Sequence, residues 1–150
     1  MNSMSRDLAG NVTAAYALAN TAVTAGASAD GEAVNGASID TAGLSSRANT
    51  LAFAIAITAT FAGDETAKVV AKIQDSADNS AWADVVAAQD VITLAGDDAT
   101  VTGAGVIGLD LGRSRRYIRV VATPSMSATA TSTMAVSAVA LLAGLDQIGG

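Results

Sequence analysis

The segment Thr50–Phe61 (TLAFAIAITATF) carries the clearest strand signal in the chain. Its large side chains fall on alternate positions, at Leu51, Phe53, Ile55, Ile57 and Phe61, with alanine or threonine between most of them. Successive side chains of a β-strand point to opposite faces, so this spacing predicts a strand with one face of large and one face of small side chains. Such a strand needs a second layer close over its large face.

Short apolar or alternating runs recur along the rest of the chain, separated by turn residues. The runs are Thr66–Asp75, Trp82–Ala87, Val91–Leu94, Val106–Leu111, Arg116–Thr123 and Met134–Ala143. The chain shows neither βαβ alternation nor a fixed-period repeat. About eight short strands with turn signals between them predict an all-β fold, an antiparallel β-sandwich or jelly roll.

Several connections can be predicted from turn residues. Asn35-Gly36 suits a type I′ turn, so we expect a hairpin around it. A second hairpin is expected across residues 112–115. The stretch Ala95–Gly105, rich in Gly, Asp and Thr, is predicted to be a loop, and Pro124 is expected to end the strand before it.

The length of 150 residues indicates one domain with a sizeable core. Residues 1–25 combine weak helical spacing with Gly, Asn and Thr, and we interpret them as an N-terminal arm holding one strand or a short helix. Residues 26–146 are assigned to the β-sandwich domain. Residues 147–150 are expected to form a loose tail.

The chain has no cysteine and no histidine. Their absence excludes disulfides and thiolate metal sites, and it removes the commonest general base. Most acidic residues lie at predicted turns, where Asp usually caps the backbone. We find no catalytic motif and therefore predict that the chain is not an enzyme and uses no cofactor.

The net charge of −6 and the pI near 4.3 argue against binding to nucleic acid or to an anionic membrane. The N-terminal residues show no signal peptide, and no apolar run is long enough for a transmembrane helix. We expect synthesis in a cytoplasm.

Residues 75–80 (DSADNS) place several oxygen atoms close together. They lack the spacing of an EF-hand calcium loop, which needs a glutamate at its twelfth position. A bound cation remains one interpretation, and a turn capped by its own side chains is the favoured one. No metal site is assigned.

Half of the 8 basic residues lie in one short segment, at Arg113, Arg115, Arg116 and Arg119. One interpretation is pairing within the chain to turn aspartates such as Asp75, Asp78 or Asp110, which contributes about 0–1 kcal/mol for exposed pairs. The other is a contact patch for an acidic partner, because Arg binds carboxylates in a bidentate manner. Both interpretations stay open.

Alanine-rich strand faces are a further candidate surface. We expect Ala52, Ala54 and Ala56, together with Ala135, Ala138 and Ala140, to form flat and mildly apolar faces. These faces suit either tight packing between sheets or contact with another copy of the chain. Trp82 is expected to anchor the core or a sheet end rather than to bind a ligand.

Three motifs carry a resemblance to known proteins. They are NGASIDTAGLSSRANTLAFAI (35–55), AKIQDSADNSAWADV (71–85) and RSRRYIRVVATP (113–124), followed by a closing apolar strand. In this order they resemble small virion proteins of tailed phages, and among these the capsid decoration (cement) proteins, over about residues 31–143. The resemblance implies a β-sandwich or jelly roll.

The resemblance also implies a partner and a location. It suggests a structural protein on the capsid surface that binds the major capsid protein in many copies, associates with copies of itself and stabilises the shell. Arg113, Arg115, Arg116 and Arg119 are then candidates for the shell or subunit contact. The alternatives are another virion component, such as a tail or head–tail joining protein, and a carbohydrate-binding adhesion module.

Overall fold

The computed structural model describes residues 8–43, 48–127 and 131–144. In chain order the elements are α1 (Leu8–Asn11), β1 (Val12–Thr24), β2 (Val34–Asn35), β3 (Ile39–Asp40), the 3-10 turn η2 (Thr41–Gly43), β4 (Thr50–Thr60), β5 (Glu65–Ser76), β6 (Ala83–Gly96), β7 (Thr100–Asp110), the 3-10 turn η3 (Leu111–Arg113), β8 (Tyr117–Met126) and β9 (Thr133–Ala143). The expected loose tail, residues 147–150, lies outside the described residues.

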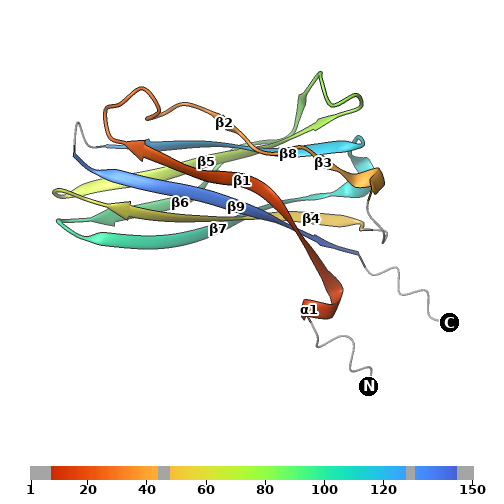
Figure 1. Cartoon of the computed structure of the whole chain (residues 1–150), viewed down its shortest axis with the longest axis horizontal. Helices are drawn as coiled ribbons and strands as arrows, with labels where there is room; N and C mark the ends of the chain where they lie inside the picture. Colours follow the sequence, from red (N-terminus) through yellow and green to blue (C-terminus); the bar gives the residue numbers. More distant parts are fainter. Residues whose placement is uncertain (1–7, 44–47, 128–130, 145–150) are drawn as a thin grey trace.

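The strands form two antiparallel sheets. Sheet A has the order β1-β9-β4-β7, and sheet B has the order β2-β8-β5-β6, with β3 pairing beside β2 on the same strand, β8. The first strand thus pairs with the last, β2 with β8, β4 with β7 and β5 with β6, as in one long hairpin folded over into two layers (Figure 1). This is the jelly-roll topology, so the predicted fold class is confirmed.

Alternation in β4 determines which side chains enter the core. Leu51, Phe53 and Ile55 are 0–1% exposed and point between the sheets. They meet inward residues of sheet B such as Ile73 and Val120, both fully buried. The prediction for Thr50–Phe61 is therefore confirmed, and the small residues of β4 other than the buried Ala59 lie on the outer face of sheet A.

The predicted hairpin at Asn35-Gly36 is wrong. Neither residue has a positive φ, and β2 and β3 both pair with β8 instead of with each other. The Gly36 N–H donates to the Val120 carbonyl in sheet B, and the next N–H, of Ala37, donates to the Ala17 carbonyl in sheet A, both at 2.7 Å. This segment links the edges of the two sheets.

The predicted loop at Ala95–Gly105 is also wrong, because β7 begins at Thr100. Gly103 and Gly105 lie on the inner face of β7, where β6 of the other sheet comes close. A Cβ on Gly105 would lie 2.3 Å from the Val91 carbonyl oxygen. These glycines permit close packing of strands and do not break one.

The expected hairpin across residues 112–115 is replaced by a crossing between sheets. β7 lies in sheet A and β8 in sheet B, joined by η3. Pro124 does not end β8, which continues to Met126. The Pro124 carbonyl accepts a hydrogen bond from the Gly31 N–H. It points to the side of β8 that β2 no longer covers, so no neighbouring strand needs the backbone N–H that proline lacks.

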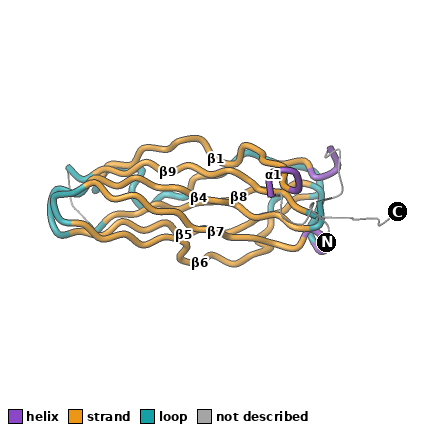
Figure 2. The backbone as a smooth tube through the Cα atoms, turned by 90° about the horizontal axis from the view of Figure 1, so that it is seen from below, coloured by secondary structure: helices purple, strands orange, loops and turns teal. Residues whose placement is uncertain are grey.

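The N-terminal segment, expected to hold one strand or a short helix, holds both. Its residues 12–24 form β1, a full strand of sheet A paired with β9, so the boundary at residue 25 does not separate an arm from the sandwich. The two expected strands between Trp82 and Leu94 are one strand, β6, with three irregularities in its pairing to β5. The long strands lie along one axis and the connections gather at the two ends (Figure 2).

Candidate functional site

The two sheets differ sharply in charge. The four strands of sheet A contain one charged residue, Asp110 at the end of β7. The strands of sheet B carry Asp40, Glu65, Lys68, Lys72, Asp75, Asp84, Asp90 and Arg119. The sandwich therefore has one uncharged side and one charged side.

The exposed large hydrophobic side chains lie on the uncharged side. Tyr16, Val106 and Val139 are 63%, 64% and 46% exposed. Tyr16 pairs across the sheet with Val139, Val139 with Ala54, and Ala54 with Val106. These four residues form one row across all four strands, which we call the apolar row.

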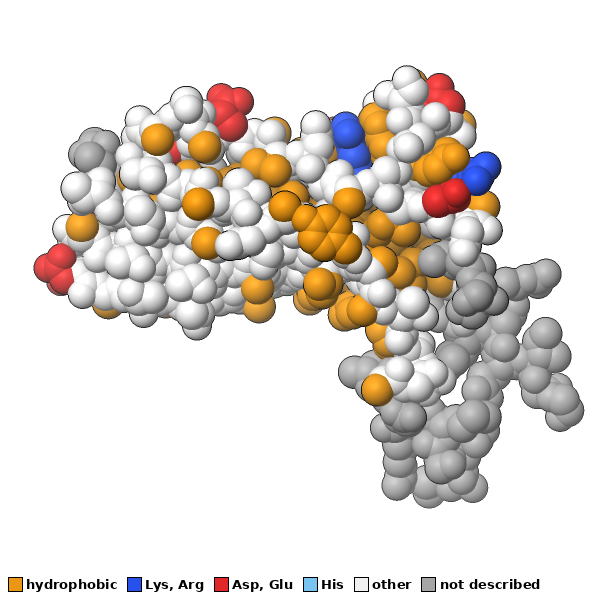
Figure 3. All heavy atoms as spheres, viewed as in Figure 1, with side chains coloured by type: hydrophobic (Ala, Val, Ile, Leu, Met, Phe, Trp, Pro, Cys, Tyr) orange, Lys and Arg blue, Asp and Glu red, His pale blue; other side chains and the backbone are white. Residues whose placement is uncertain are grey.

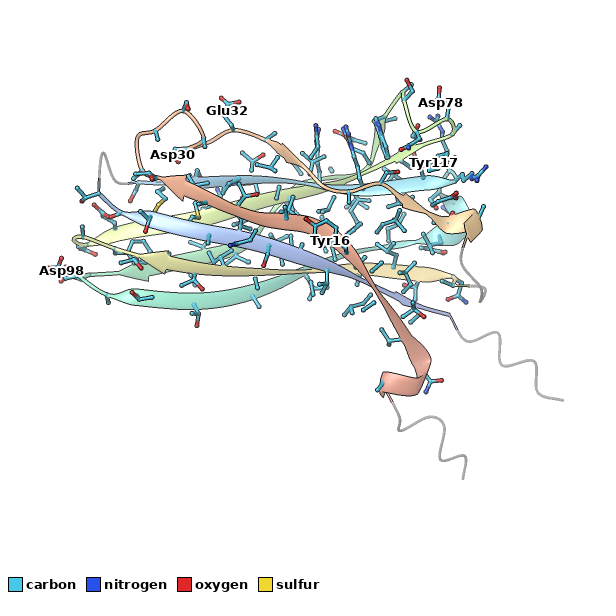
Figure 4. The ribbon with its side chains drawn as sticks, viewed as in Figure 1. Tyr16, Asp30, Glu32, Asp78, Asp98 and Tyr117 are labelled. Carbon is cyan, nitrogen blue, oxygen red and sulfur yellow. The ribbon has the colours of Figure 1, made fainter. Side chains whose placement is uncertain are left out.

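The neighbouring positions continue this surface with uncharged and mostly small residues, Ser137 among them. Leu141, Ala52 and Gly108 are paired in the next row, and Ala56 is paired with Ala104 on the other side. Figure 3 shows hydrophobic side chains gathered near the middle of the view, with acidic and basic side chains toward its ends and upper edge. Figure 4 places Tyr16 in that central region. The outer face of sheet A is thus uncharged and is apolar around this row, with threonines toward one end, and we call it the apolar plate.

The expected alanine faces are correct in part. Ala52, Ala54 and Ala56 lie on the outer face, as does Ala135. Ala138 and Ala140 are 4% and 0% exposed and belong to the core, because they lie two and four residues after the buried Val136 and so point to the same face of β9.

Ion pairs and hydrogen bonds cover the outer face of sheet B. Lys68 Nζ lies 2.8 Å from an Asp90 carboxylate oxygen, and Lys72 Nζ lies 3.0 Å from Asp84. The Asp84 carboxylate also accepts from the Gln74 amide, and these two hydrogen bonds, that of Gln74 first, lower the pKa of Asp84. The charges on this face are therefore satisfied by one another.

Arg119 belongs to the same face. Its Nε and one terminal nitrogen donate to Gln74 Oε1 at 3.0 and 2.8 Å. Its guanidinium carbon lies 4.3 Å from the centre of the Trp82 ring, a cation–π contact. Partial burial lowers the pKa of Arg119. Trp82 lies just before β6, half-buried and outside the core clusters, so it anchors Arg119 on the surface.

The arginines of the sequence cluster have different partners. Arg116 makes a bidentate pair with Asp40 at 2.8 and 2.7 Å, which lowers the pKa of Asp40. The Arg115 N–H donates to the buried Asp75 carboxylate, whose other oxygen lies 3.9 Å from Arg115 Nε. Arg113 is exposed and has no charged partner among the described residues.

Asp40, the partner of Arg116, is not one of the turn aspartates that the sequence offered as partners for the arginines. Of the three that it offered, Asp75 pairs with Arg115, whereas the Asp110 carboxylate accepts from the Gly112 N–H and caps η3. The pairing with Asp40 depends on β3 lying beside β8, which sequence spacing does not reveal.

The turn at residues 76–81 is capped by its own side chains, as favoured. The Asp78 carboxylate accepts from the Ala81 and Ser80 N–H groups at 2.9 Å and from Ser76 Oγ at 3.0 Å. These hydrogen bonds, the backbone ones first, lower the pKa of Asp78. Asn79 has a φ of 60°, the left-handed conformation that such a turn needs.

The described residues contain no group of three or more Asp, Glu, His or Cys side chains arranged to hold a metal ion. Within the same residues, no helix combines the length and apolar character needed to cross a membrane.

Comparisons with known proteins give no family. No family model and no curated protein matches the chain. Among solved structures, the PBSX exported protein XepA is 18% identical with a TM-score of 0.49, over 92% of this chain and 39% of that one. A chain of infectious bursal disease virus, Gx strain, is 14% identical with a TM-score of 0.46, over 90% and 32%.

A third structure is the CBM22-1 xylan-binding domain of Paenibacillus barcinonensis Xyn10C. It is 11% identical with a TM-score of 0.35, over 90% of this chain and 87% of that one. The chain spans less than two thirds of the first two matched chains. These values describe a loose likeness in the path of the backbone and say nothing of function.

Proposed function

We propose that the chain is a structural protein of a tailed-phage virion, of the decoration (cement) type, that binds the major capsid protein in many copies on the capsid surface. The observation that carries this proposal is the uncharged outer face of sheet A, opposite a charged sheet B. The resemblance of the three sequence motifs to tailed-phage virion proteins supplies the biological context.

The apolar plate suits docking on a protein lattice for three physical reasons. Burying it removes no charge from water, so the large desolvation penalty of ionic groups does not arise. Alanine loses no side-chain entropy when it becomes ordered at an interface. Many copies held on one lattice also turn individually weak contacts into stable attachment, because the effective concentration is high.

The charged side complements this role. With the plate docked, the ion pairs of sheet B face the solvent, and the net charge of −6 keeps neighbouring particles apart. Synthesis in the host cytoplasm followed by attachment to finished shells is the route this proposal implies.

The arginines have separate roles in this proposal. Arg116 and Arg119 are already engaged by Asp40, Gln74 and Trp82, so their use as a shell contact would break those interactions. Arg113 and Arg115, both exposed, remain candidates for contact with the shell or a neighbouring subunit.

A carbohydrate-binding role finds less support in the placement of the aromatic rings. Tyr16 lies on the outer face of sheet A, whereas Trp82 and Tyr117 lie near sheet B. Arg119 covers Trp82, and Arg116 lies 5.0 Å from the Tyr117 ring centre. The three rings therefore form no shared platform for a sugar.

Copy number in purified virions tests the proposal. Quantitative gel densitometry should give a number approaching that of the major capsid protein. A few copies per particle would favour a tail or head–tail joining protein, and absence from the particle would reject a virion role.

A matched pair of variants tests the docking face. Val139→Glu places a charge in the middle of the apolar row, and Thr93→Glu places the same charge on an exposed position of β6 in sheet B. We expect Val139→Glu to lower occupancy on capsids and Thr93→Glu to leave it unchanged. Equal occupancy of both variants would reject the plate as the docking face.

A further inference from the structure

Each sheet has two edge strands, which present unpaired backbone groups along one side. Three of the four edges carry features that hinder pairing with another strand. β2 has only two residues. β1 has two irregularities in its register with β9 and is bonded to Ala37 through Ala17. β6 has three register shifts and carries Asp84 and Asp90.

The fourth edge, β7, has none of these features. All eleven of its residues pair with β4 in continuous register, from Thr50 opposite Asp110 to Thr60 opposite Thr100. It contains no proline and no charge before Asp110. Among the described residues β7 pairs with β4 alone, and Figure 1 places it along the lower margin with no described strand beyond it.

We propose that β7 pairs antiparallel with β7 of a second copy, about a two-fold axis near Gly105. This pairing joins the two four-stranded sheets A into one continuous sheet. This inference adds a surface for self-association to the proposed structural role. It is argued from the geometry of β7 and does not depend on whether the chain attaches to a particle.

The charges at the ends of β7 favour a second copy in the antiparallel direction. Asp97 and Asp98 lie in the turn before β7, and Asp98 is at one end of the sandwich (Figure 4). The exposed Arg113 follows β7 at the other end, beside Asp110. Antiparallel pairing brings Arg113 of each copy toward the acidic turn of the other, whereas parallel pairing would bring the two acidic turns together.

The symmetry has a consequence for the apolar plate. Two antiparallel strands in one sheet are related by an axis perpendicular to that sheet, so both copies present the same face to the same side. With the axis at Gly105, Val106 lies opposite Ala104 of the partner subunit, so the uncharged outer face of one copy continues across the junction into that of the other. Pairing through β7 therefore doubles the uncharged plate without burying it.

Sedimentation of the purified chain over a range of concentrations tests the inference. We expect a reversible dimer for the wild type. Val106→Lys places like charges close together across the junction and should weaken dimerisation by about tenfold or more. Val139→Lys is the control, because it puts the same charge in the same row on the inner strand β9 and should leave the dimer intact.

Each result has a defined meaning. A monomer at every concentration, or a dimer unaffected by Val106→Lys, overturns the inference. Loss of the dimer in Val139→Lys with its retention in Val106→Lys also overturns it and assigns self-association to the face instead. Val106 is 64% exposed, so Val106→Lys should keep the thermal stability of the wild type at concentrations where the wild type is monomeric, which a melting curve checks.

Hydrogen exchange of the wild-type chain provides a second test that needs no variant. Pairing at the edge should protect alternate amides of β7, those that point away from β4, as the concentration rises. Unchanged exchange at these amides would overturn the inference. Copy number on virions is a separate measurement, so failure of the β7 dimer and failure of the virion role can be told apart.

Discussion

Replacing Gly36 by alanine should destabilise the fold by separating the edges of the two sheets. A Cβ at this position would lie 2.5 Å from the Ala17 carbonyl oxygen and 2.7 Å from that of Val120. Both are backbone atoms in strands of different sheets, so neither can give way by a change of rotamer. The hydrogen bonds that Gly36 and Ala37 donate to these two carbonyls must therefore lengthen.

The expected cost follows from these contacts. Overpacking of this kind costs about 1–3 kcal/mol. Weakening two backbone hydrogen bonds adds up to about 0.5–1.5 kcal/mol for each. We expect the free energy of unfolding to fall by about 2–6 kcal/mol, which for a chain of this size lowers the Tm by roughly 4–24 °C.

Thermal and urea unfolding measure this change. Gly43→Ala is the matched control, because no atom lies within 4 Å of the added Cβ and φ is not positive there. It should stay within about 0.5 kcal/mol of the wild type. If Gly36→Ala were as stable as Gly43→Ala, the link between the sheet edges would not have the role described.

Two further predictions concern the charged side and the core. The hydrogen bonds to Asp40, Asp78 and Asp84 hold their pKa values below the ordinary 3.8 and require ionised carboxylates. The unfolded chain therefore binds protons at higher pH than the folded chain, so their stabilisation is present above about pH 4 and lost as the pH falls below it. Melting temperatures that stay constant down to about pH 2 would contradict this. Phe53→Ala should cost about 3–5 kcal/mol in urea unfolding, whereas Thr58→Ala on the outer face should cost under about 0.5 kcal/mol; similar values for both would refute the assigned faces of β4.

The fold class could be predicted because alternation is a local signal. The pattern from Leu51 to Phe61 determines which face of β4 is buried, and the capped turn around Asp78 follows from its own side chains. Neither feature depends on distant parts of the chain.

The errors arose where a distant contact decides the local structure. Gly103 and Gly105 suggested a loop, but they are needed because β6 packs close against β7. Asn35-Gly36 suggested a tight turn, but β8 offers both flanking segments a better partner than they offer each other.

The candidate surface was foreseen in part for the same reason. The outward alanines of β4 were recognised from their spacing, whereas the apolar row requires the registers of four strands. The arginines were visible as a cluster in sequence, but β3 brings Asp40 to Arg116, and the packing of Trp82 and Gln74 engages Arg119.

An image of the assembled particle at side-chain resolution tests the central claim most directly. The proposal predicts this sandwich at repeated positions over the capsid, with the apolar row against protein and the ion pairs of sheet B in solvent. A particle in which the chain occupies only the tail, or in which sheet A faces the solvent, would contradict it.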